Sequence, residues 1–265
     1  MDAQHFEREQ EMMYWNYKQQ KCDNMKGLTM GITTILFDLD GTLLPMDNDV
    51  FTKGYFKLLV QKLAPHGYDP QELVGAIWKG TEAMVKNDGQ SSNYEVFWKT
   101  FAQVLGDRVY DTKLIFDSFY ANEFNQAKFY CGFNEKAMET VKAAKERGFR
   151  IVLASNPIFP TDAQIARLKW AGIAQDEMEF ITSYENCSYC KPNPEYYLAV
   201  AKHLDVRPEE CLMIGNDVDE DMIAETVGMS VFLLTDHIIN RQNKDISVYP
   251  NGDFSQAAQY IKEII

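Results

Sequence analysis

The chain has 265 residues and a formal net charge of −13, with 46% of its residues hydrophobic and 25% charged. This length suits one large core, or a core domain with a smaller partner domain, and this composition is that of a globular protein rather than a disordered one. A surface of this sign repels phosphate backbones and anionic lipid, so we expect no nucleic acid and no membrane as a partner. It does not exclude a small-molecule phosphate ester, because a local cation can reverse the field at one site.

Residues 1–29 are interpreted as an N-terminal extension, either a helix or a disordered segment, because Gln, Glu and Lys dominate them. They lack the positive start and the apolar run of a secretory signal, and no later segment approaches the roughly 18 apolar residues of a membrane span. The five cysteines are an odd number without a zinc-ligand pattern. We therefore expect a soluble, cytoplasmic protein with reduced cysteines.

A strand and then a long helical insert follow the extension. Residues 32–37 are β-branched or apolar and run into DLDGT at 38–42, which predicts a buried strand that ends in a turn. Apolar residues at helical spacing predict three helices between about residues 51 and 104, and further helix from about residue 112. The sequence therefore predicts a helical domain of residues 47–129 inserted into a core domain of residues 30–46 and 130–265.

Strands and helices alternate after the insert. The pattern predicts helices over 134–147, 161–171, 194–204 and 219–227, strands over 151–154, 179–182, 211–214 and 230–234, and a last helix from Asp253 or Ser255 through Ile264. Such alternation is typical of a parallel, doubly wound α/β sheet with right-handed crossovers. Ligands bind such sheets at the carboxyl ends of the strands, so the residues just past each apolar run are the functional candidates.

Four groups of polar residues stand at these predicted strand ends. They are Asp38 with Asp40, Ser155 with Asn156, Lys191 in KPNPEYY, and the acidic run GNDVDED at 215–221. Each group alone has a structural interpretation as a turn, a helix cap, a loop lysine or the start of a helix. All four fall on one edge of one predicted sheet, however, and this coincidence favours a functional site.

At least three carboxylates, those of Asp38, Asp217, and Asp40 or Asp221, would crowd together at this edge. Like charges so close raise one another's pKa values and cost several kcal/mol unless a cation lies among them. Oxygen ligands without His or Cys favour a hard ion such as Mg²⁺. A lysine and a hydroxyl beside carboxylates and Mg²⁺ are the groups that hold a phosphoryl group.

DLDGT, Ser155, Lys191 in KPNPEYY and GNDVDED together resemble the four motifs of the haloacid-dehalogenase-like superfamily, in that family's order. The resemblance spans residues 32–234 and implies a Rossmann-like core with an all-helical cap in the first insertion position, as in phosphoglycolate phosphatase-like members. It implies Asp38 as the nucleophile and Asp40 as the general acid/base. The other implied roles are substrate binding by Ser155, Asn156, Lys191, Gly41 and Thr42, of which Ser155 and Lys191 are also catalytic, and Mg²⁺ binding by Asp38, Asp217 and the carbonyl of Asp40, supported by Asp221.

One local departure concerns the fourth motif. Asn216 stands between Gly215 and Asp217, where many relatives place the acid directly after the glycine. We align the acids by the spacing from Asp217 to Asp221, and Asp219 is the alternative metal ligand.

The resemblance implies a Mg²⁺-dependent phosphatase that acts on a small phosphomonoester through a phospho-aspartate on Asp38. Asp40 argues against the metal-free dehalogenase branch, which lacks this second acid. A response-regulator receiver does not fit either, because its phosphorylated Asp lies on a middle strand, whereas the candidate nucleophile here ends the first strand. A phosphomutase shares every core residue and stays open, as does a non-catalytic phosphate-binding module. The sequence leaves the substrate and the oligomeric state open.

Overall fold

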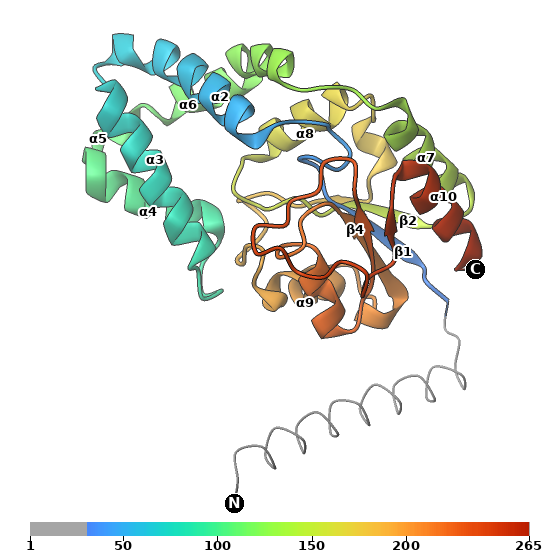
Figure 1. The fold of residues 1–265 in the computed structure, drawn as a ribbon. Coiled ribbons are helices and arrows are strands. Elements are labelled where there is room, and N and C mark those ends of the chain that lie inside the picture. The colour runs from blue at the N-terminus through green and yellow to red at the C-terminus, as the bar shows by residue number, and fades with distance from the viewer. Residues whose placement is uncertain (1–30, 265) are drawn as a thin grey trace, which may run out of the picture. The chain divides into compact units, whose positions relative to one another are not determined.

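A six-stranded sheet is the centre of the part of the chain that the structure, a computed structural model, describes, which is residues 31–264 (Figure 1). The strands are β1 Thr34–Phe37, β2 Arg150–Leu153, β3 Phe180–Ile181, β4 Cys211–Gly215, β5 Ser230–Leu234 and β6 Asn251–Gly252, in the sheet order β3-β2-β1-β4-β5-β6. All pairings are parallel, and β1 lies between β2 and β4. The predicted parallel, doubly wound α/β sheet is confirmed; the expected extension of residues 1–29 lies outside the described residues.

β1 is buried on both faces because its apolar residues alternate between two cores. Ile35 and Phe37 belong to the core that also holds residues of helices α7 Glu135–Glu146, α8 Thr161–Trp170 and α10 Phe254–Glu263. Leu36 belongs to the core on the other face, with helix α9 Pro194–His203 and the 3-10 helix η5 Met222–Val227. Figure 1 shows α7 and α10 on one side of the strands and α9 on the other.

The core helices begin where the sequence supplies a side-chain acceptor. Asn134 accepts from the backbone N–H of Lys136 at the start of α7, and Asp253 accepts from Gln256 at the start of α10. Asn193 caps α9, whose first residue is Pro194. Two further 3-10 helices are η3 Gln175–Glu177 and η4 Pro208–Glu210. Predicted helix ends therefore agree with the structure to within a residue or two for α7, α8, α9 and α10.

A helical segment joins β1 to β2. Its elements are α2 Asn48–Leu63, η1 Ala64–His66, α3 Pro70–Val85, α4 Asn93–Leu105, α5 Arg108–Asp111, α6 Lys113–Ala121 and η2 Glu123–Tyr130. Side chains of Asp47, Asp69 and Ser92 cap the three long helices. The helices predicted between residues 51 and 104 are present, and their buried aromatic residues pack together as core.

The start of α4 is tied to the loops that follow β2 and precede α9. The fully buried Asn93 donates from Nδ2 to the carbonyl of Pro157 (3.2 Å) and to Sγ of Cys190 (3.3 Å), and its backbone N–H donates to Cys187. The backbone N–H of Tyr94 donates to the carbonyl of Tyr184 at 2.6 Å. These contacts hold one end of the helical segment against the loop that leads to Lys191.

One prediction about the second half of the chain is wrong, and one short strand was not predicted. The predicted helix over 219–227 is absent: residues 219–221 form a turn and only the 3-10 helix η5 follows. The reason is that Asp217 accepts the N–H groups of Asp219 and Glu220, which folds the segment back on itself. Strand β6 was not expected, because its two residues, Asn251 and Gly252, carry no apolar pattern. None of the described helices is both long and apolar enough to cross a membrane.

Candidate active site

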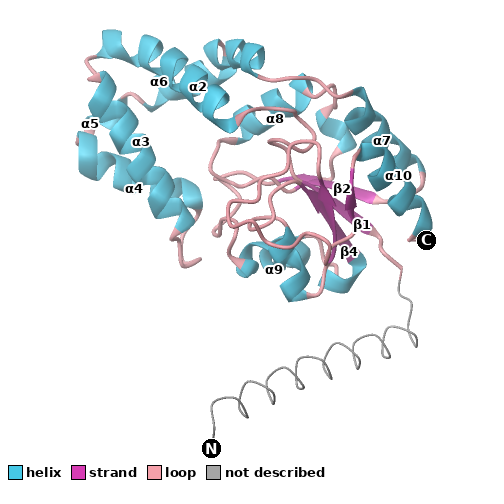
Figure 2. Cartoon of the chain, viewed as in Figure 1, coloured by secondary structure: helices cyan, strands magenta, loops and turns pink. Residues whose placement is uncertain are grey.

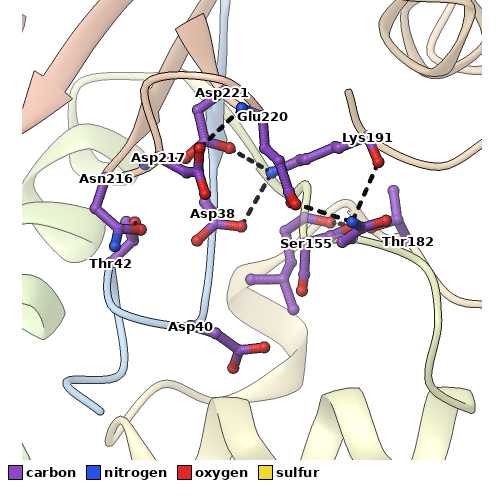
Figure 3. Close-up of polar contacts among 12 residues, drawn as sticks. Asp38, Asp40, Thr42, Ser155, Thr182, Lys191, Asn216, Asp217, Glu220 and Asp221 are labelled. Atoms are coloured by element: carbon purple, nitrogen blue, oxygen red, sulfur yellow. Dashed lines mark hydrogen bonds and ion pairs between the residues drawn. The ribbon is translucent and has the colours of Figure 1, made fainter. Parts of the chain in front are cut away.

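The loops after β1, β2, β3 and β4 bring the predicted polar residues to one edge of the sheet, as the loops in Figure 2 and the side chains in Figure 3 show. Parallel pairing places Asp38, Ser155 and Asn216 just past neighbouring strand ends. A cavity of about 310 Å³ lies there, and we call it the acidic cavity. Its polar lining includes Asp38, Asp40, Ser155, Asn156, Asp217, Glu220, Asp221 and Arg241.

Lys191 neutralises the centre of this site. Its ammonium is 1% exposed and donates to Oδ1 of Asp38 at 2.9 Å and to Oδ1 of Asp221 at 2.6 Å (Figure 3). Burial by itself lowers the pKa of Lys191, but the carboxylates of Asp221 and Asp38 outweigh burial and hold that pKa well above its ordinary value. The lysine is therefore a fixed positive charge against Asp38.

Asp221 is the fully buried partner in this pair. Burial raises the pKa of its carboxyl group, and the charge of Lys191 opposes that rise. Its second oxygen, Oδ2, accepts from the backbone N–H of Asp217 at 2.9 Å. The same side chain thus fixes both the lysine and the loop that carries Asp217.

Asp40 faces a buried arginine that the sequence did not single out. Nη1 of Arg167 in α8 donates to Oδ2 of Asp40, while Nη2 of Arg167 donates to Gln164 at 2.6 Å. Arg167 is fully buried and lies over the ring of Phe159, 4.3 Å from its centroid. Oδ1 of Asp40 is buried and has no hydrogen-bond partner among the described residues. Burial raises the pKa of Asp40, and Arg167 opposes that rise.

The loop after β4 is held by its own acids and by a distant segment. Oδ1 of Asp217 accepts from the N–H groups of Asp219 (2.8 Å) and Glu220 (3.0 Å), and Oδ2 accepts from Nη1 of Arg241 at 2.6 Å. A short parallel bridge pairs Asp217 with Ile239 and brings the segment before Arg241 alongside. Asp217 is therefore paired with a cation that the sequence gave no reason to place there.

Glu220 is a second acid that the motif analysis passed over. Its Oε2 accepts from Nδ2 of Asn156 at 3.0 Å. Burial raises the pKa of Glu220 to about 7, with Asp217 and Asp38 adding to the rise and Lys191 opposing it. Asn156 also donates to the carbonyl of Lys191 at 3.4 Å, so it joins the loops after β2 and β4.

Gly41 and Thr42 lie beside the acidic cavity rather than in its lining. The hydroxyl of Thr42 donates to Oδ1 of Asn216 at 2.8 Å, and Nδ2 of Asn216 donates to the carbonyl of His237. Gly41 has a φ of +85°, and a Cβ there would come within 2.4 Å of Nδ2 of Asn216, so only glycine fits. These three residues brace the loop that carries Asp38 and Asp40 against the loop that carries Asp217.

The other predicted site residues fall as follows. Ser155 is 2% exposed and lines the acidic cavity; its carbonyl accepts from the hydroxyls of Thr182 (2.8 Å) and Tyr196 (3.0 Å). Asp219, the alternative metal ligand, is not in the lining and accepts from Nζ of Lys244 at 2.5 Å. The structure therefore groups Asp217 with Asp38 and leaves Asp219 outside.

The donor atoms of the acidic cavity suit a hard cation. Oxygen atoms of Asp38 and Asp217 face one space without an imidazole or thiolate in its lining, and such a set selects Mg²⁺ over softer metals. No cluster of three or more His, Cys, Asp or Glu side chains arranged to hold a metal occurs in residues 31–264. Mg²⁺ typically keeps several waters and takes only one or two carboxylates from a protein, so the two carboxylates fit it.

Comparison with known proteins places this geometry in a family. A haloacid dehalogenase-like hydrolase model matches residues 32–224. YhcW of Bacillus subtilis is 34% identical over 109 residues, which are 40% of this chain and only 48% of that protein. Phosphoglycolate phosphatase of Nitrosospira multiformis is 24% identical over 207 residues, which are 76% of this chain and 82% of that protein.

A solved structure agrees in fold. A haloacid dehalogenase-like (HAD) phosphatase from Thermococcus onnurineus superposes with a TM-score of 0.52 at 16% identity, covering 87% of this chain and 98% of the other. At that identity the likeness shows the fold alone. The family match, however, covers most of the chain and includes the segments that carry Asp38, Ser155, Lys191 and Asp217. The chain belongs to the haloacid dehalogenase-like hydrolase family and is an enzyme of the hydrolase class.

Proposed function

We propose that the chain is a Mg²⁺-dependent phosphatase that hydrolyses a small phosphomonoester through a phospho-aspartate on Asp38. The observation that carries this proposal is that the buried Lys191 pairs with Asp38 and Asp221, two acids that line one cavity together with a third, Asp40. The resemblance of the chain to a phosphoglycolate phosphatase over 207 residues supports the same reaction class. The specific substrate is left open by these observations.

Asp38 acts as the nucleophile. Its carboxylate attacks phosphorus, the bond to the leaving oxygen breaks, and an aspartyl phosphate forms. Lys191 holds Oδ1 of Asp38 at 2.9 Å, which orients the carboxylate and reduces its repulsion toward the phosphate anion. The hydroxyl of Ser155 and the backbone N–H of Asn156, two residues of the cavity lining, are the proposed ligands of the phosphate oxygens.

Asp40 acts as the general acid and then the general base. It gives a proton to the leaving oxygen in the first step and takes one from water in the second, when that water attacks phosphorus and frees Asp38. A raised pKa supports this role, because the carboxyl must be protonated when the first step begins. Arg167 binds Oδ2 of Asp40, which fixes the orientation of this carboxyl group.

Mg²⁺ would be held by the carboxylates of Asp38 and Asp217 and by the backbone carbonyl of Asp40, with Asp221 fixing the loop of Asp217. The ion supplies positive charge that offsets the repulsion between two anions. We also propose that residues 47–129 form a cap domain over a core of residues 30–46 and 130–265, and that the cap selects the leaving group.

The test is release of phosphate from p-nitrophenyl phosphate with Mg²⁺ or with EDTA. We expect turnover that requires the metal and is lost by at least about 10³-fold in Asp38→Asn. Asp162→Asn, which changes an exposed acid on α8, is the matched control and should keep full activity. Metal-independent turnover, or full activity in Asp38→Asn, would overturn the proposal.

A further inference from the structure

A partly enclosed cavity lined largely by aromatic residues lies next to the acidic cavity, and we call it the aromatic chamber. It measures about 100 Å³ and is lined mainly by residues of α2, α3, α4 and α6. Thr52, Trp78, Ile158 and Phe159 line both the chamber and the acidic cavity. A substrate with its phosphoryl group against Asp38 therefore has the chamber directly beside its leaving group.

The chamber is built from rings that are already packed against one another. Tyr55, Phe97, Trp98 and Phe116 line it; the ring of Trp98 meets that of Phe97 edge-on at 5.8 Å and that of Phe116 at 5.4 Å. Trp98 is 4% exposed, so this wall is a formed surface rather than a loose collection of side chains. The volume of the chamber is comparable to that of an apolar cavity of roughly 150 Å³ that is known to bind benzene.

Among the described residues, none in the lining of the chamber carries a positive charge. The one carboxylate in that lining, Asp117, is already held by Lys113 at 2.9 Å. The hydroxyls of Tyr55 and Tyr120 bond each other at 2.8 Å, and burial raises the pKa of Tyr55 to about 12, which keeps that hydroxyl neutral. A leaving group with a second phosphate or a carboxylate would be desolvated here without a partner.

We propose that the substrate is a phosphomonoester with an uncharged ring or compact apolar leaving group, and that this group occupies the aromatic chamber. The inference rests on the proposed phosphatase function, since the position of the phosphoryl group defines which end is the leaving group. The alternative position for the leaving group is an open cavity of about 620 Å³, which shares Asn216 and Arg241 with the acidic cavity. Its lining also includes His237 and Asp47, and it would suit a charged leaving group.

The test compares benzyl phosphate with glycerol 1-phosphate and phosphoglycolate, which are all primary alkyl phosphates and so differ little in leaving-group chemistry. We expect kcat/KM for benzyl phosphate to be about 10- to 100-fold higher than for the other two. Phe56→Ala, in the chamber wall, should lower that ratio about tenfold. Phe129→Ala removes a ring that is 88% exposed and lines neither cavity, and it should leave the ratio unchanged.

Binding to Asp38→Asn separates the two proposals. Quenching of tryptophan fluorescence by benzyl phosphate, but not by glycerol 1-phosphate, reports occupancy of the chamber through Trp78 and Trp98 without any turnover. Metal-dependent turnover with equal or better use of phosphoglycolate would overturn the inference and leave the phosphatase proposal standing. Selective binding of benzyl phosphate without turnover of any ester would overturn the phosphatase proposal and leave the assignment of the chamber standing. Neither turnover nor selective binding would overturn both.

Discussion

Arg167 and Asp40 are 127 positions apart in the sequence and meet in a buried ion pair at the edge of the sheet. The arginine is fully buried, and its second terminal nitrogen, Nη2, donates to Oε1 of Gln164. A buried arginine is held to its partner, because moving away would leave its charge buried without a counter-ion. We therefore interpret Arg167 as the residue that positions the general acid/base.

Arg167→Met should lower kcat about 10- to 100-fold with little change in KM, because Asp40 loses its orientation while phosphate binding is unaffected. Arg167→Lys should recover part of the loss. Steady-state kinetics with p-nitrophenyl phosphate provides the measurement. Arg207→Met, which breaks an exposed pair with Glu210, is the control. An effect on KM alone would contradict the assignment.

Lys191→Met should destabilise the fold by about 3–5 kcal/mol, since Asp38 and Asp221 would both lose their buried counter-ion. Urea unfolding in EDTA measures this loss. Adding Asp221→Leu to Lys191→Met should restore part of it, because one of the stranded charges is then gone. Lys142→Met, at an exposed position, should change little. A double variant as unstable as the single one would contradict this account.

Glu220 predicts a pH dependence of stability. Its pKa is about 7 in the folded protein against an ordinary value of 4.5, so the folded state binds the proton more tightly than the unfolded state. The contribution of Glu220 to the free energy of unfolding therefore becomes less favourable as the pH rises from 4.5 to about 7.

Glu220→Gln removes this titration and keeps an acceptor for Asn156. We expect the variant to gain stability relative to wild type as the pH rises across that window, by about 1–3 kcal/mol at pH 8. Thermal or urea unfolding in EDTA at several pH values measures the difference. A difference that is constant with pH, or that favours wild type more at high pH, would show that Glu220 is not held in this way.

The contact between Arg241 and Asp217 predicts that the arginine competes with Mg²⁺ for this carboxylate. Its guanidinium pairs with Oδ2 of Asp217, a proposed Mg²⁺ ligand, and its side chain is 56% exposed. Arg241→Gln should tighten Mg²⁺ binding by a factor of about 2 to 5, as loss of a partly exposed ion pair permits. Calorimetric titration measures the affinity directly. Lys244→Gln, which frees Asp219 instead, is the matched control. Weaker Mg²⁺ binding in Arg241→Gln would contradict the proposal.

Periodicity and the position of strand ends were sufficient to predict five of the six strands and to gather Asp38, Ser155 and Asp217 at one edge. Both succeed because a parallel strand is a short apolar run and because all such strands end on the same side. The helix predicted over 219–227 failed because the side chain of Asp217 competes for the N–H groups that a helix would use.

The two arginines show different limits of sequence reasoning. Gln164 and Arg167 are three positions apart and share a face of α8 with Leu168, and polar residues at core spacing were a sequence signal that could have found them. Arg241 lies in a loop without a pattern, and only the bridge between Asp217 and Ile239 brings it to the site. Such a contact depends on the path of the loop in space and leaves no local trace in the sequence.

A covalent intermediate on Asp38 leaves a signature in the stereochemical course of the reaction at phosphorus. An isotopically chiral phosphate ester is hydrolysed in labelled water, and the configuration of the released phosphate is determined. Two successive displacements, by Asp38 and then by water, predict overall retention. Inversion would show that water attacks the ester in a single step, and it would contradict the proposed role of Asp38.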